Sequence, residues 1–230
     1  MYDNVFKRVE QKYLINAYQK EELLKRINDY IEKDEYYKSE ISNIYFDNDN
    51  QELLVESLEK PSFKVKIRLR SYNTPKLNDY VFLEIKDKVN GIVGKRRIKL
   101  TLKEFYDYLN NQDIKDSQIM KELDYYFKLF NLKPYMFVAY DRLSYKEKNN
   151  KNLRITIDSN LRSRNDNLNL EAGNYGTNYF DNETYIMEIK GLDSMPLWLV
   201  KNLSDLKIYP VSFSKVGSIY TKNKRSEVLC

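Results

Sequence analysis

The chain has 230 residues, of which 39 are Lys or Arg and 34 are Asp or Glu, giving a formal net charge of +5. This length suits one domain with a sizeable core, and the positive charge is too small to indicate a nucleic-acid binder by itself. The chain has no histidine and one cysteine, Cys230, which excludes Ser-His-Asp hydrolysis, His-ligated metals and intrachain disulfides. Any metal must therefore be held by oxygen ligands.

The sequence carries no signal for a membrane or for secretion. No apolar run approaches the roughly 18 residues that a membrane span needs, and residues 1–8 lack the apolar core of a signal peptide. No linker rich in Gly, Ser or Pro divides the chain, and neither GxxxxGK[S/T] nor GxGxxG occurs. We therefore expect a single domain, residues 1–230, in a reducing cytoplasm and without an integral membrane segment.

In the first half of the chain, alternating polar and apolar residues predict strands at 5–15, 41–47, 63–70, 81–88 and 95–100. Between the first two strands, apolar residues at helical spacing predict a helix at 19–31. The Asn90-Gly91 pair predicts a tight turn that joins its neighbouring strands into a hairpin. Thr101 and Glu104 have the spacing of a capping box, which predicts a helix at 102–109.

In the second half, an amphipathic pattern predicts a helix at 117–129. Strands at 135–146 and 153–158 are expected to pair antiparallel around an Asn-rich turn, and a further strand is expected at 184–190. Ser194 and Pro196 indicate the start of a helix that runs to Leu206, and a short helix is expected at 214–222. About eight mostly antiparallel strands with helices between them predict an α+β fold.

Several of these strands carry charged side chains on one face. The strand at 63–70 has a row of Lys and Arg, whereas other strands mix the signs of charge. An open sheet with one solvated face would produce this pattern, and so would a closed barrel with an ionic lumen. Cations lining a lumen require a polyanion, and carboxylates among them can hold Mg²⁺ or Mn²⁺. Together these groups are typical of phosphoryl transfer.

The strand containing Arg8-x-Glu10-x-Lys12-Tyr13 resembles the N-terminal strand of the vacuolar transporter chaperone (VTC) domain. That family is a branch of the triphosphate tunnel metalloenzymes and is related to the CYTH group. Further similar segments follow in order, at residues 44–47, 64–72, 82–86, 95–97, 139–142, 153–158, 187–190 and 212–215. The resemblance implies an antiparallel β-barrel of about eight strands that forms a triphosphate tunnel, with helices packed outside.

The resemblance also implies an activity and a role for each matching residue. The activity is that of a polyphosphate polymerase, which uses ATP and Mn²⁺ or Mg²⁺ to extend inorganic polyphosphate. The implied catalytic residues are Arg68, Arg70, Arg154 and Lys190. The implied substrate-binding residues are Lys12, Lys64, Lys66, Lys86, Lys95, Arg97, Arg142 and Lys215. Glu188 is the implied metal ligand, with Glu10 and Glu84 as further candidates.

Other functions remain open from the sequence. CYTH triphosphatases carry Glu where this chain has Arg8, a difference that favours holding a long anion over hydrolysing a short one. The second hypothesis is a triphosphatase that hydrolyses tripolyphosphate or a nucleotide, and the third is a non-catalytic polyphosphate-binding module. We expect ATP and inorganic polyphosphate or triphosphate as ligands. Nucleic acid is not expected, because the cations lie among carboxylates without a row of stacking aromatic residues.

Overall fold

The computed structural model describes residues 8–59, 62–89, 92–110, 117–149, 153–181, 183–192 and 194–228. The strands are β1 (Arg8–Asn16), β2 (Ile31–Asp47), β3 (Phe63–Tyr72), β4 (Tyr80–Val89), β5 (Ile92–Thr101), β6 (Lys133–Glu147), β7 (Arg154–Arg164), β8 (Thr177–Asn178) and β9 (Thr184–Leu192). The helices are α1 (Ala17–Arg26), α2 (Glu52–Leu58), α3 (Leu102–Leu109), α4 (Gln118–Leu129), α5 (Leu197–Asp205) and α6 (Lys215–Val228).

Hydrogen bonds connect the strands in the order β1-β9-β7-β6-β2-β3-β4-β5, with β8 paired to β7. Antiparallel pairing joins β1 to β9, β9 to β7, β2 to β3, β3 to β4 and β4 to β5. The expected α+β fold with antiparallel strands is therefore confirmed. The order ends at β1 and β5, and no pairing between these two strands is present in the described part of the chain. The expected closed barrel is thus not confirmed.

The chain divides into two compact units. Unit 1 comprises residues 1–40, 140–161 and 178–214, and unit 2 comprises residues 41–139, 162–177 and 215–230. The long strands β2, β6 and β7 contribute residues to both units. Each unit has a hydrophobic core of its own, and the single domain expected for residues 1–230 stays a prediction.

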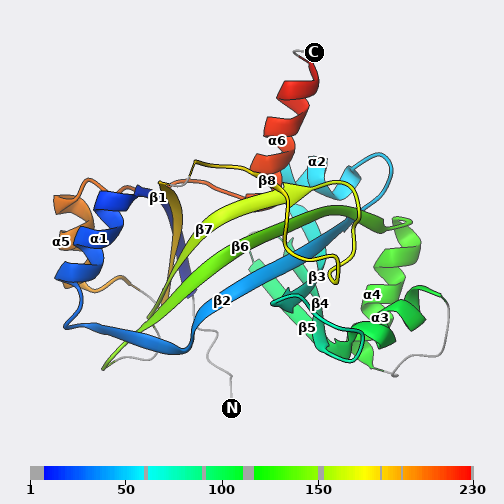
Figure 1. Cartoon of the computed structure of the whole chain (residues 1–230), viewed down its shortest axis with the longest axis horizontal. Coiled ribbons are helices and arrows are strands. Elements are labelled where there is room, and N and C mark those ends of the chain that lie inside the picture. Colours follow the sequence, from blue (N-terminus) through cyan, green and yellow to red (C-terminus); the bar gives the residue numbers. More distant parts are fainter. Residues whose placement is uncertain are drawn as a thin grey trace. The chain divides into compact units, whose positions relative to one another are not determined.

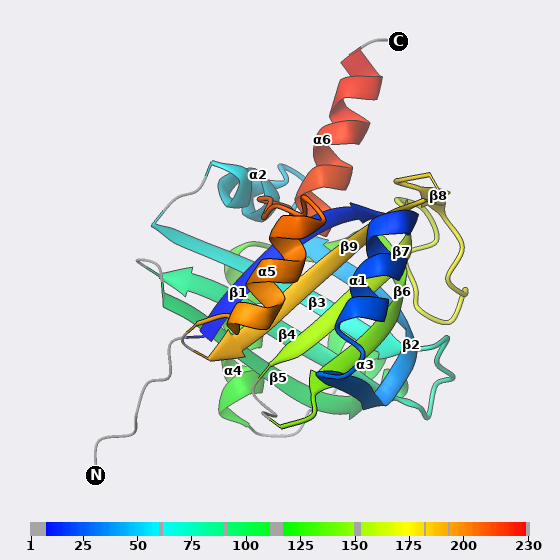
Figure 2. The same cartoon turned by 90° about the vertical axis from the view of Figure 1, so that its left-hand side faces the viewer.

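In unit 1, helices α1 and α5 cover one face of strands β1, β7 and β9 (Figure 2). Alternation along the strands turns every second side chain toward these helices. The core that results contains Tyr13, Ile15, Leu23, Ile27, Ile155, Ile157, Met187, Ile189, Leu199 and Leu203. Fully burying one Leu, Ile or Met side chain contributes about 1.5–3 kcal/mol to the stability of the fold. Packing on this face therefore determines which strand residues point to the opposite face.

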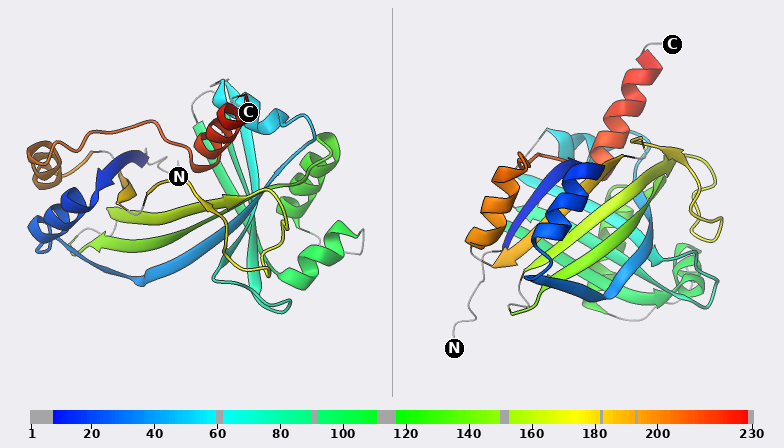
Figure 3. Two further views of the ribbon diagram at one scale, coloured as in Figure 1. Left: turned by 45° about the horizontal axis from the view of Figure 1, so that its top comes forward. Right: turned by 60° about the vertical axis from the view of Figure 1, so that its left-hand side comes forward.

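In unit 2, helices α3 and α4 lie against one face of β3, β4 and β5 (Figures 1 and 3). The core beneath them contains Val65, Ile67, Leu69, Leu83, Ile85, Leu100, Leu102, Phe105, Leu123 and Phe127. Because these apolar residues alternate with charged ones on the same strands, the helices cover the apolar face and leave the ionic face on the other side. The expected separation of an apolar, helix-covered face from an ionic face is therefore confirmed within each unit.

The capping box predicted for α3 is confirmed. The Thr101 Oγ1 atom accepts a hydrogen bond from the Glu104 backbone N–H at 3.1 Å, and the Thr101 N–H donates to Glu104 Oε2 at 2.6 Å. The helix expected at 117–129 is α4, and Ser117 is its N-cap, since the Ser117 side chain accepts a hydrogen bond from the Met120 N–H. None of the helices that the structure describes combines the length and the apolar character needed to cross a bilayer.

Two expected boundaries in the first quarter of the chain are wrong, although the helix and the strand themselves are present. The helix expected at 19–31 ends at Arg26, and β2 begins at Ile31, ten residues before the expected strand at 41–47. Ile31 packs into the core of unit 1, so a tertiary contact decides its conformation. Helix α2 was not expected, and its first turn depends on Asp47, whose two carboxylate oxygens accept from the N–H groups of Leu53 and Leu54 at 3.0 and 2.9 Å.

Other boundaries differ less. Strand β7 extends to Arg164 instead of 158, and α6 extends to Val228 instead of 222. Strands β4 and β5 pair as expected, although their predicted Asn90-Gly91 turn lies outside the described residues. The turn at 150–152 and Cys230 also lie outside them.

The segment that follows α5 returns along β1. Tyr13 and Pro210 form an isolated antiparallel bridge, and the Val211 N–H donates to the Lys12 carbonyl at 2.7 Å. The Lys12 ammonium in turn donates to the Phe213 carbonyl at 3.0 Å. This arrangement holds one of the expected substrate-binding lysines against the backbone.

Candidate functional site

The ionic face of unit 2 is built from three neighbouring strands. Register places Arg68 opposite Glu84, Arg70 opposite Phe82, and Lys66 opposite Lys86. On the next strand, Lys95 lies opposite Lys86 and Arg97 lies opposite Glu84. We call this surface the basic face; it carries Lys64, Lys66, Arg68, Arg70, Glu84, Lys86, Lys88, Lys95, Arg97 and Lys99. Cations thus outnumber carboxylates strongly on these strands, which predicts affinity for an anion.

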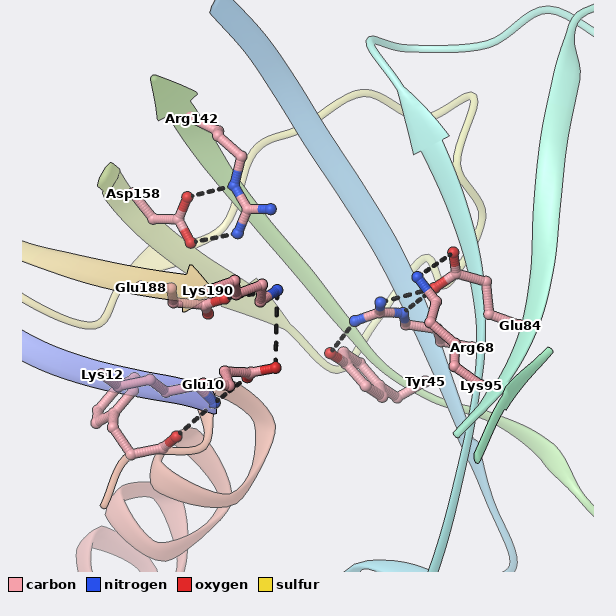
Figure 4. Close-up of polar contacts among 11 residues, drawn as sticks. Glu10, Lys12, Tyr45, Arg68, Glu84, Lys95, Arg142, Asp158, Glu188 and Lys190 are labelled. Atoms are coloured by element: carbon pink, nitrogen blue, oxygen red, sulfur yellow. Dashed lines mark hydrogen bonds and ion pairs between the residues drawn. The ribbon is translucent and has the colours of Figure 1, made fainter. Parts of the chain in front are cut away.

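Glu84 lies at the centre of the basic face. Its Oε2 atom accepts hydrogen bonds from Nε and Nη2 of Arg68 at 2.9 and 2.6 Å. Its Oε1 atom lies 3.3 Å from Lys95 Nζ and 4.0 Å from Arg97 Nη1. The remaining Arg68 nitrogen, Nη1, donates to the Tyr45 hydroxyl at 3.2 Å. Figure 4 shows four of these side chains converging from strands β2 to β5, namely those of Tyr45, Arg68, Glu84 and Lys95.

The charges around Glu84 determine its protonation. Burial alone would raise the pKa of this carboxyl, but Arg68, Arg70 and Lys95 outweigh burial and lower the pKa to about 2. Burial, together with Arg68 and Arg70, lowers the pKa of the Lys95 ammonium, while Glu84 opposes that change. Glu84 therefore remains ionised at every physiological pH, and it acts as a fixed negative charge instead of a proton donor.

Arg70 is also held in place, and an amide is among its partners. Its side chain is buried, and its Nε donates to the Asn43 side-chain oxygen at 2.9 Å. The Asn43 amide nitrogen donates to the Val138 carbonyl at 3.0 Å. Both Arg68 and Arg70 are thus oriented by partners on β2, which reduces the conformational entropy that binding an anion would cost.

The ionic face of unit 1 lies on β1, β7 and β9. Register places Glu10 opposite Lys190 and Lys12 opposite Glu188. The Lys190 ammonium lies 3.3 Å from Glu188 Oε2 and 3.8 Å from Glu10 Oε2, while Lys12 Nζ lies 3.8 Å from Glu10 Oε1 (Figure 4). Two carboxylates therefore converge on one cation at this position.

A second ionic pair of unit 1 is more deeply buried. Arg142 donates two hydrogen bonds to Asp158, from Nε at 2.6 Å and from Nη2 at 2.7 Å. Burial opposes the charge on Arg142, yet Tyr140, Asp158 and Glu188 together keep its pKa above the ordinary value. Arg154, which lies opposite Lys190, instead pairs with Asp34 at 2.9 Å.

The structure therefore distributes the predicted residues over two faces. Arg68, Arg70, Lys95, Arg97 and Glu84 form one set of contacts, with Lys64, Lys66 and Lys86 on the same face by register. Glu10, Lys12, Glu188, Lys190, Arg142 and Arg154 belong to the face of unit 1. Lys215 is the first residue of α6, in unit 2. The role of each residue stays a prediction.

Sequence reasoning missed the partners that orient the arginines. Tyr45 and Asn43 lie on β2 opposite Arg68 and Arg70. Asp158 and Asp34 pair with Arg142 and Arg154 on other strands. Asp158 carried a signal, because it shares an alternating face with Arg154. The others depend on strand register, which the sequence does not reveal for strands far apart in the chain.

The carboxylates that the structure describes are spread over both ionic faces. Within the described ranges, no three Asp or Glu side chains are gathered closely enough to hold an ion together. Glu84 is surrounded by basic groups, whereas Glu10 and Glu188 both approach the Lys190 ammonium. Glu10 and Glu188 are accordingly the pair best placed to bind a divalent cation.

Comparison with known proteins identifies the family. The VTC domain matches residues 7–221. Vacuolar transporter chaperone complex subunit 4 of Schizosaccharomyces pombe is 28% identical in an alignment 145 residues long, and that alignment covers 53% of this chain. The aligned part spans only 20% of that relative's length.

Solved structures of low sequence identity share the fold. A proposed adenylate cyclase from Bacillus halodurans is similar at a TM-score of 0.56 and 16% identity, over 90% of this chain and 93% of that one. A proposed adenylyl cyclase from Hippeastrum, described as having a dominant triphosphatase activity, matches at a TM-score of 0.53 and 13% identity. That match covers 94% of this chain and 96% of the other.

The antiparallel sheet, with helices over its apolar face and cations on its other face, is the α+β fold that this chain shares with these solved structures. The chain belongs to the VTC domain family, as the match over nearly its whole length establishes. The resemblance drawn from the sequence is therefore confirmed.

Proposed function

We propose that this chain is a metal-dependent phosphotransferase, namely a polyphosphate polymerase that transfers the γ-phosphate of ATP to a growing polyphosphate chain in a cation-lined tunnel. The observation that carries the proposal is the basic face, where Arg68, Arg70 and Lys95 are preorganised around one carboxylate. Arginine forks and lysine point charges suit phosphoryl oxygens. Membership of the VTC family supports inorganic polyphosphate as the polyanion.

The reaction depends on electrostatics more than on proton transfer. The terminal phosphate of a bound chain is already ionised, so its oxygen attacks the γ-phosphorus of ATP without a general base. A new P–O bond forms as the bond to ADP breaks, and ADP leaves. Arg68 and Arg70 neutralise the charge that develops on the transferred group, while Tyr45 and Asn43 hold the two guanidinium groups in place. The proposal also retains Arg154 and Lys190, which lie opposite each other on the ionic face of unit 1, as catalytic residues.

A divalent cation, Mn²⁺ or Mg²⁺, is part of the proposal. Glu188 and Glu10 fit such an ion, because both carboxylates already lie within 3.8 Å of the Lys190 ammonium. Mg²⁺ is commonly held by one or two carboxylates together with phosphate oxygens and water. When bound, the cation would supply positive charge to phosphoryl oxygens. Glu84 fits less well, since Arg68 and Lys95 occupy its oxygens.

A triphosphatase is the second candidate. Its supporting observation is the shared fold with the Hippeastrum protein, which is described as having a dominant triphosphatase activity. The two reactions differ only in whether water or a phosphate oxygen attacks the γ-phosphorus. A non-catalytic polyphosphate-binding module would bind the same anions without turnover.

The products distinguish these candidates. Purified protein is incubated with γ-labelled ATP and Mn²⁺, and the products are resolved by chain length on a gel. A ladder of long chains is the expected result. Free orthophosphate without a ladder would establish the triphosphatase, and tight polyphosphate binding without either product would establish the binding module.

Two neighbouring arginines provide a matched control. Arg97 lies on the basic face with its side chain 51% exposed, whereas Arg96 points to the other side of β5 and pairs with Asp87 and Glu122. Arg97→Ala should slow chain growth roughly 10-fold or more, and Arg96→Ala should leave the rate within about twofold. Arg68→Ala should cost roughly 10²–10³-fold. Equal rates for all three variants would contradict the role of the basic face.

The metal proposal has its own test. Mn²⁺ binding is measured by the loss of the free-ion signal in electron paramagnetic resonance, for the wild type and for Glu188→Gln. Weaker Mn²⁺ binding by the variant is expected. Unchanged binding would show that the ion, if required, is held elsewhere.

We further propose that the chain acts as one domain in the cytoplasm. One family model that spans residues 7–221 supports the single domain. The single cysteine supports the compartment, because a fold without disulfides is suited to a reducing environment.

A further inference from the structure

Three aromatic side chains lie at one end of the basic face. Tyr72 follows Arg70 by two residues on β3, and Tyr80 and Phe82 precede Glu84 by four and two residues on β4. Because side chains alternate along a strand, all three rings share the face of the cations. We call this group the aromatic end. Tyr72 and Tyr80 are 44% and 58% exposed, so neither ring is accounted for by a hydrophobic core.

The aromatic end is connected to Glu84 through Arg97. The rings of Tyr72 and Phe82 meet edge to face, with centroids 5.8 Å apart. The guanidinium carbon of Arg97 lies 4.7 Å from the centre of the Phe82 ring, and Nη1 of the same residue lies 4.0 Å from Glu84 Oε1. Arg97 therefore bridges the rings and the acidic centre of the basic face.

A further cation lies over the outermost ring. The Lys99 ammonium is 3.7 Å from the centre of the Tyr80 ring. The basic face thus changes in character along its strands, from aromatic rings with cations, through the arginines, to lysines alone at Lys64, Lys66, Lys86 and Lys88. Phe82 and Lys86 are four residues apart, which in an antiparallel strand corresponds to about 14 Å.

We propose that Tyr72, Tyr80 and Phe82 form a nucleobase subsite, with the phosphates of a nucleoside triphosphate extending from it along Arg70, Arg68 and Lys95. This inference rests on the proposed function and adds an orientation to it. The base lies at the aromatic end, the γ-phosphate lies toward the lysines, and the polyphosphate chain occupies the lysine end. Flat rings beside cations suit this ligand because bases stack on aromatic faces while phosphates pair with basic groups.

The subsite also predicts a pattern of base specificity. Stacking uses the π-face that every base has, so it is tolerant of base identity. Larger rings offer more area for stacking, and ATP and GTP should accordingly bind with similar affinity and more tightly than CTP or UTP.

The test compares ATP, which has a nucleoside, with inorganic tripolyphosphate, which has none. Dissociation constants of ATP and of inorganic tripolyphosphate are measured by calorimetry for the wild type, Tyr72→Ala and Phe82→Leu. Loss of one stacking ring typically weakens binding of a base by about 5- to 150-fold. We expect a weakening in this range for ATP in both variants, with tripolyphosphate affinity within about twofold of the wild type.

The control is Tyr125→Ala. Tyr125 is 60% exposed on α4, which packs against the apolar face of the same unit. This variant should bind both ligands as the wild type does. If Tyr72→Ala and Phe82→Leu leave ATP affinity unchanged, or weaken tripolyphosphate equally, the nucleobase subsite is refuted. If the wild type binds neither ligand, the proposed function fails and the subsite fails with it.

Discussion

Glu84→Gln is predicted to make the protein less stable and to strengthen its binding to anions. The carboxylate is buried, and Arg68, Arg70 and Lys95 lower its pKa from the ordinary value of 4.5 to about 2. A difference of this size between the unfolded and folded states corresponds to about 3 kcal/mol of stability at neutral pH. Glutamine keeps the shape of the side chain but loses the charge, so the free energy of unfolding should fall by about that amount.

The difference in stability between the wild type and Glu84→Gln should depend on pH. A carboxylate whose pKa is lowered by folding contributes its full stability above the unfolded value, here 4.5, and loses that contribution as the pH falls toward about 2. Urea unfolding of the wild type and of Glu84→Gln should therefore differ most near pH 7 and converge below pH 4.5. Asp49→Asn is the control, because its pair with Lys133 is on the surface and is worth at most about 1 kcal/mol.

Anion binding should change in the opposite direction. Removing the charge of Glu84 releases Arg68 and Lys95 from a competing carboxylate. In calorimetry without added metal, we expect tripolyphosphate to bind several-fold more tightly to the folded variant, on the order of 1–2 kcal/mol. Weaker binding by a variant that remains folded would refute this reasoning, because it would show that the negative charge itself is needed to present the cations.

Three further predictions concern other parts of the chain. Asp158→Asn should lower the free energy of unfolding, measured with urea, by about 3–5 kcal/mol, because the buried charge of Arg142 loses the carboxylate that it pairs with. A decrease of less than about 1 kcal/mol would contradict this prediction. Arg164→Lys should accelerate proteolysis within residues 165–176. The Arg164 guanidinium donates hydrogen bonds to the carbonyls of Gly173, Tyr175 and Asn169, and a lysine ammonium lacks the forked geometry needed to replace it. An unchanged cleavage rate would count against this prediction. Thr101→Ala should lower the thermal midpoint through about 1 kcal/mol of lost capping, and an unchanged midpoint would show that packing alone holds α3.

Local patterns predicted the elements that carry the basic face. The strict alternation at residues 63–70 was sufficient to place Arg68 and Arg70 on one face of the strand and the core residues Ile67 and Leu69 on the other face, as the structure confirms. The capping box at Thr101 likewise located the start of α3. In both cases the signal lies within a few residues of the feature it determines, so no knowledge of the fold was needed.

Features that depend on distant residues were not predictable. The first part of β2 reads as polar sequence, and it is extended because Ile31 and Tyr37 pack into the core of unit 1. Helix α2 starts where the Asp47 carboxylate accepts hydrogen bonds from N–H groups in the first turn of the helix. Asp47 lies before the N-cap residue, which is the usual source of such a cap. The contact between Arg68 and Tyr45 similarly requires the register of β2 on β3.

The segment that follows α5 has a consequence for the solubility of unit 1. A strand with one unpaired side presents free N–H and C=O groups that can template pairing with another chain. In the part of the chain that the structure describes, β1 pairs with β9 along one side, and the bridge between Tyr13 and Pro210, with the hydrogen bond from Val211 to Lys12, occupies part of the other side. Proline cannot donate to an incoming strand, and the Lys12 ammonium is held beside it. Unit 1 thereby carries built-in protection against edge-to-edge aggregation.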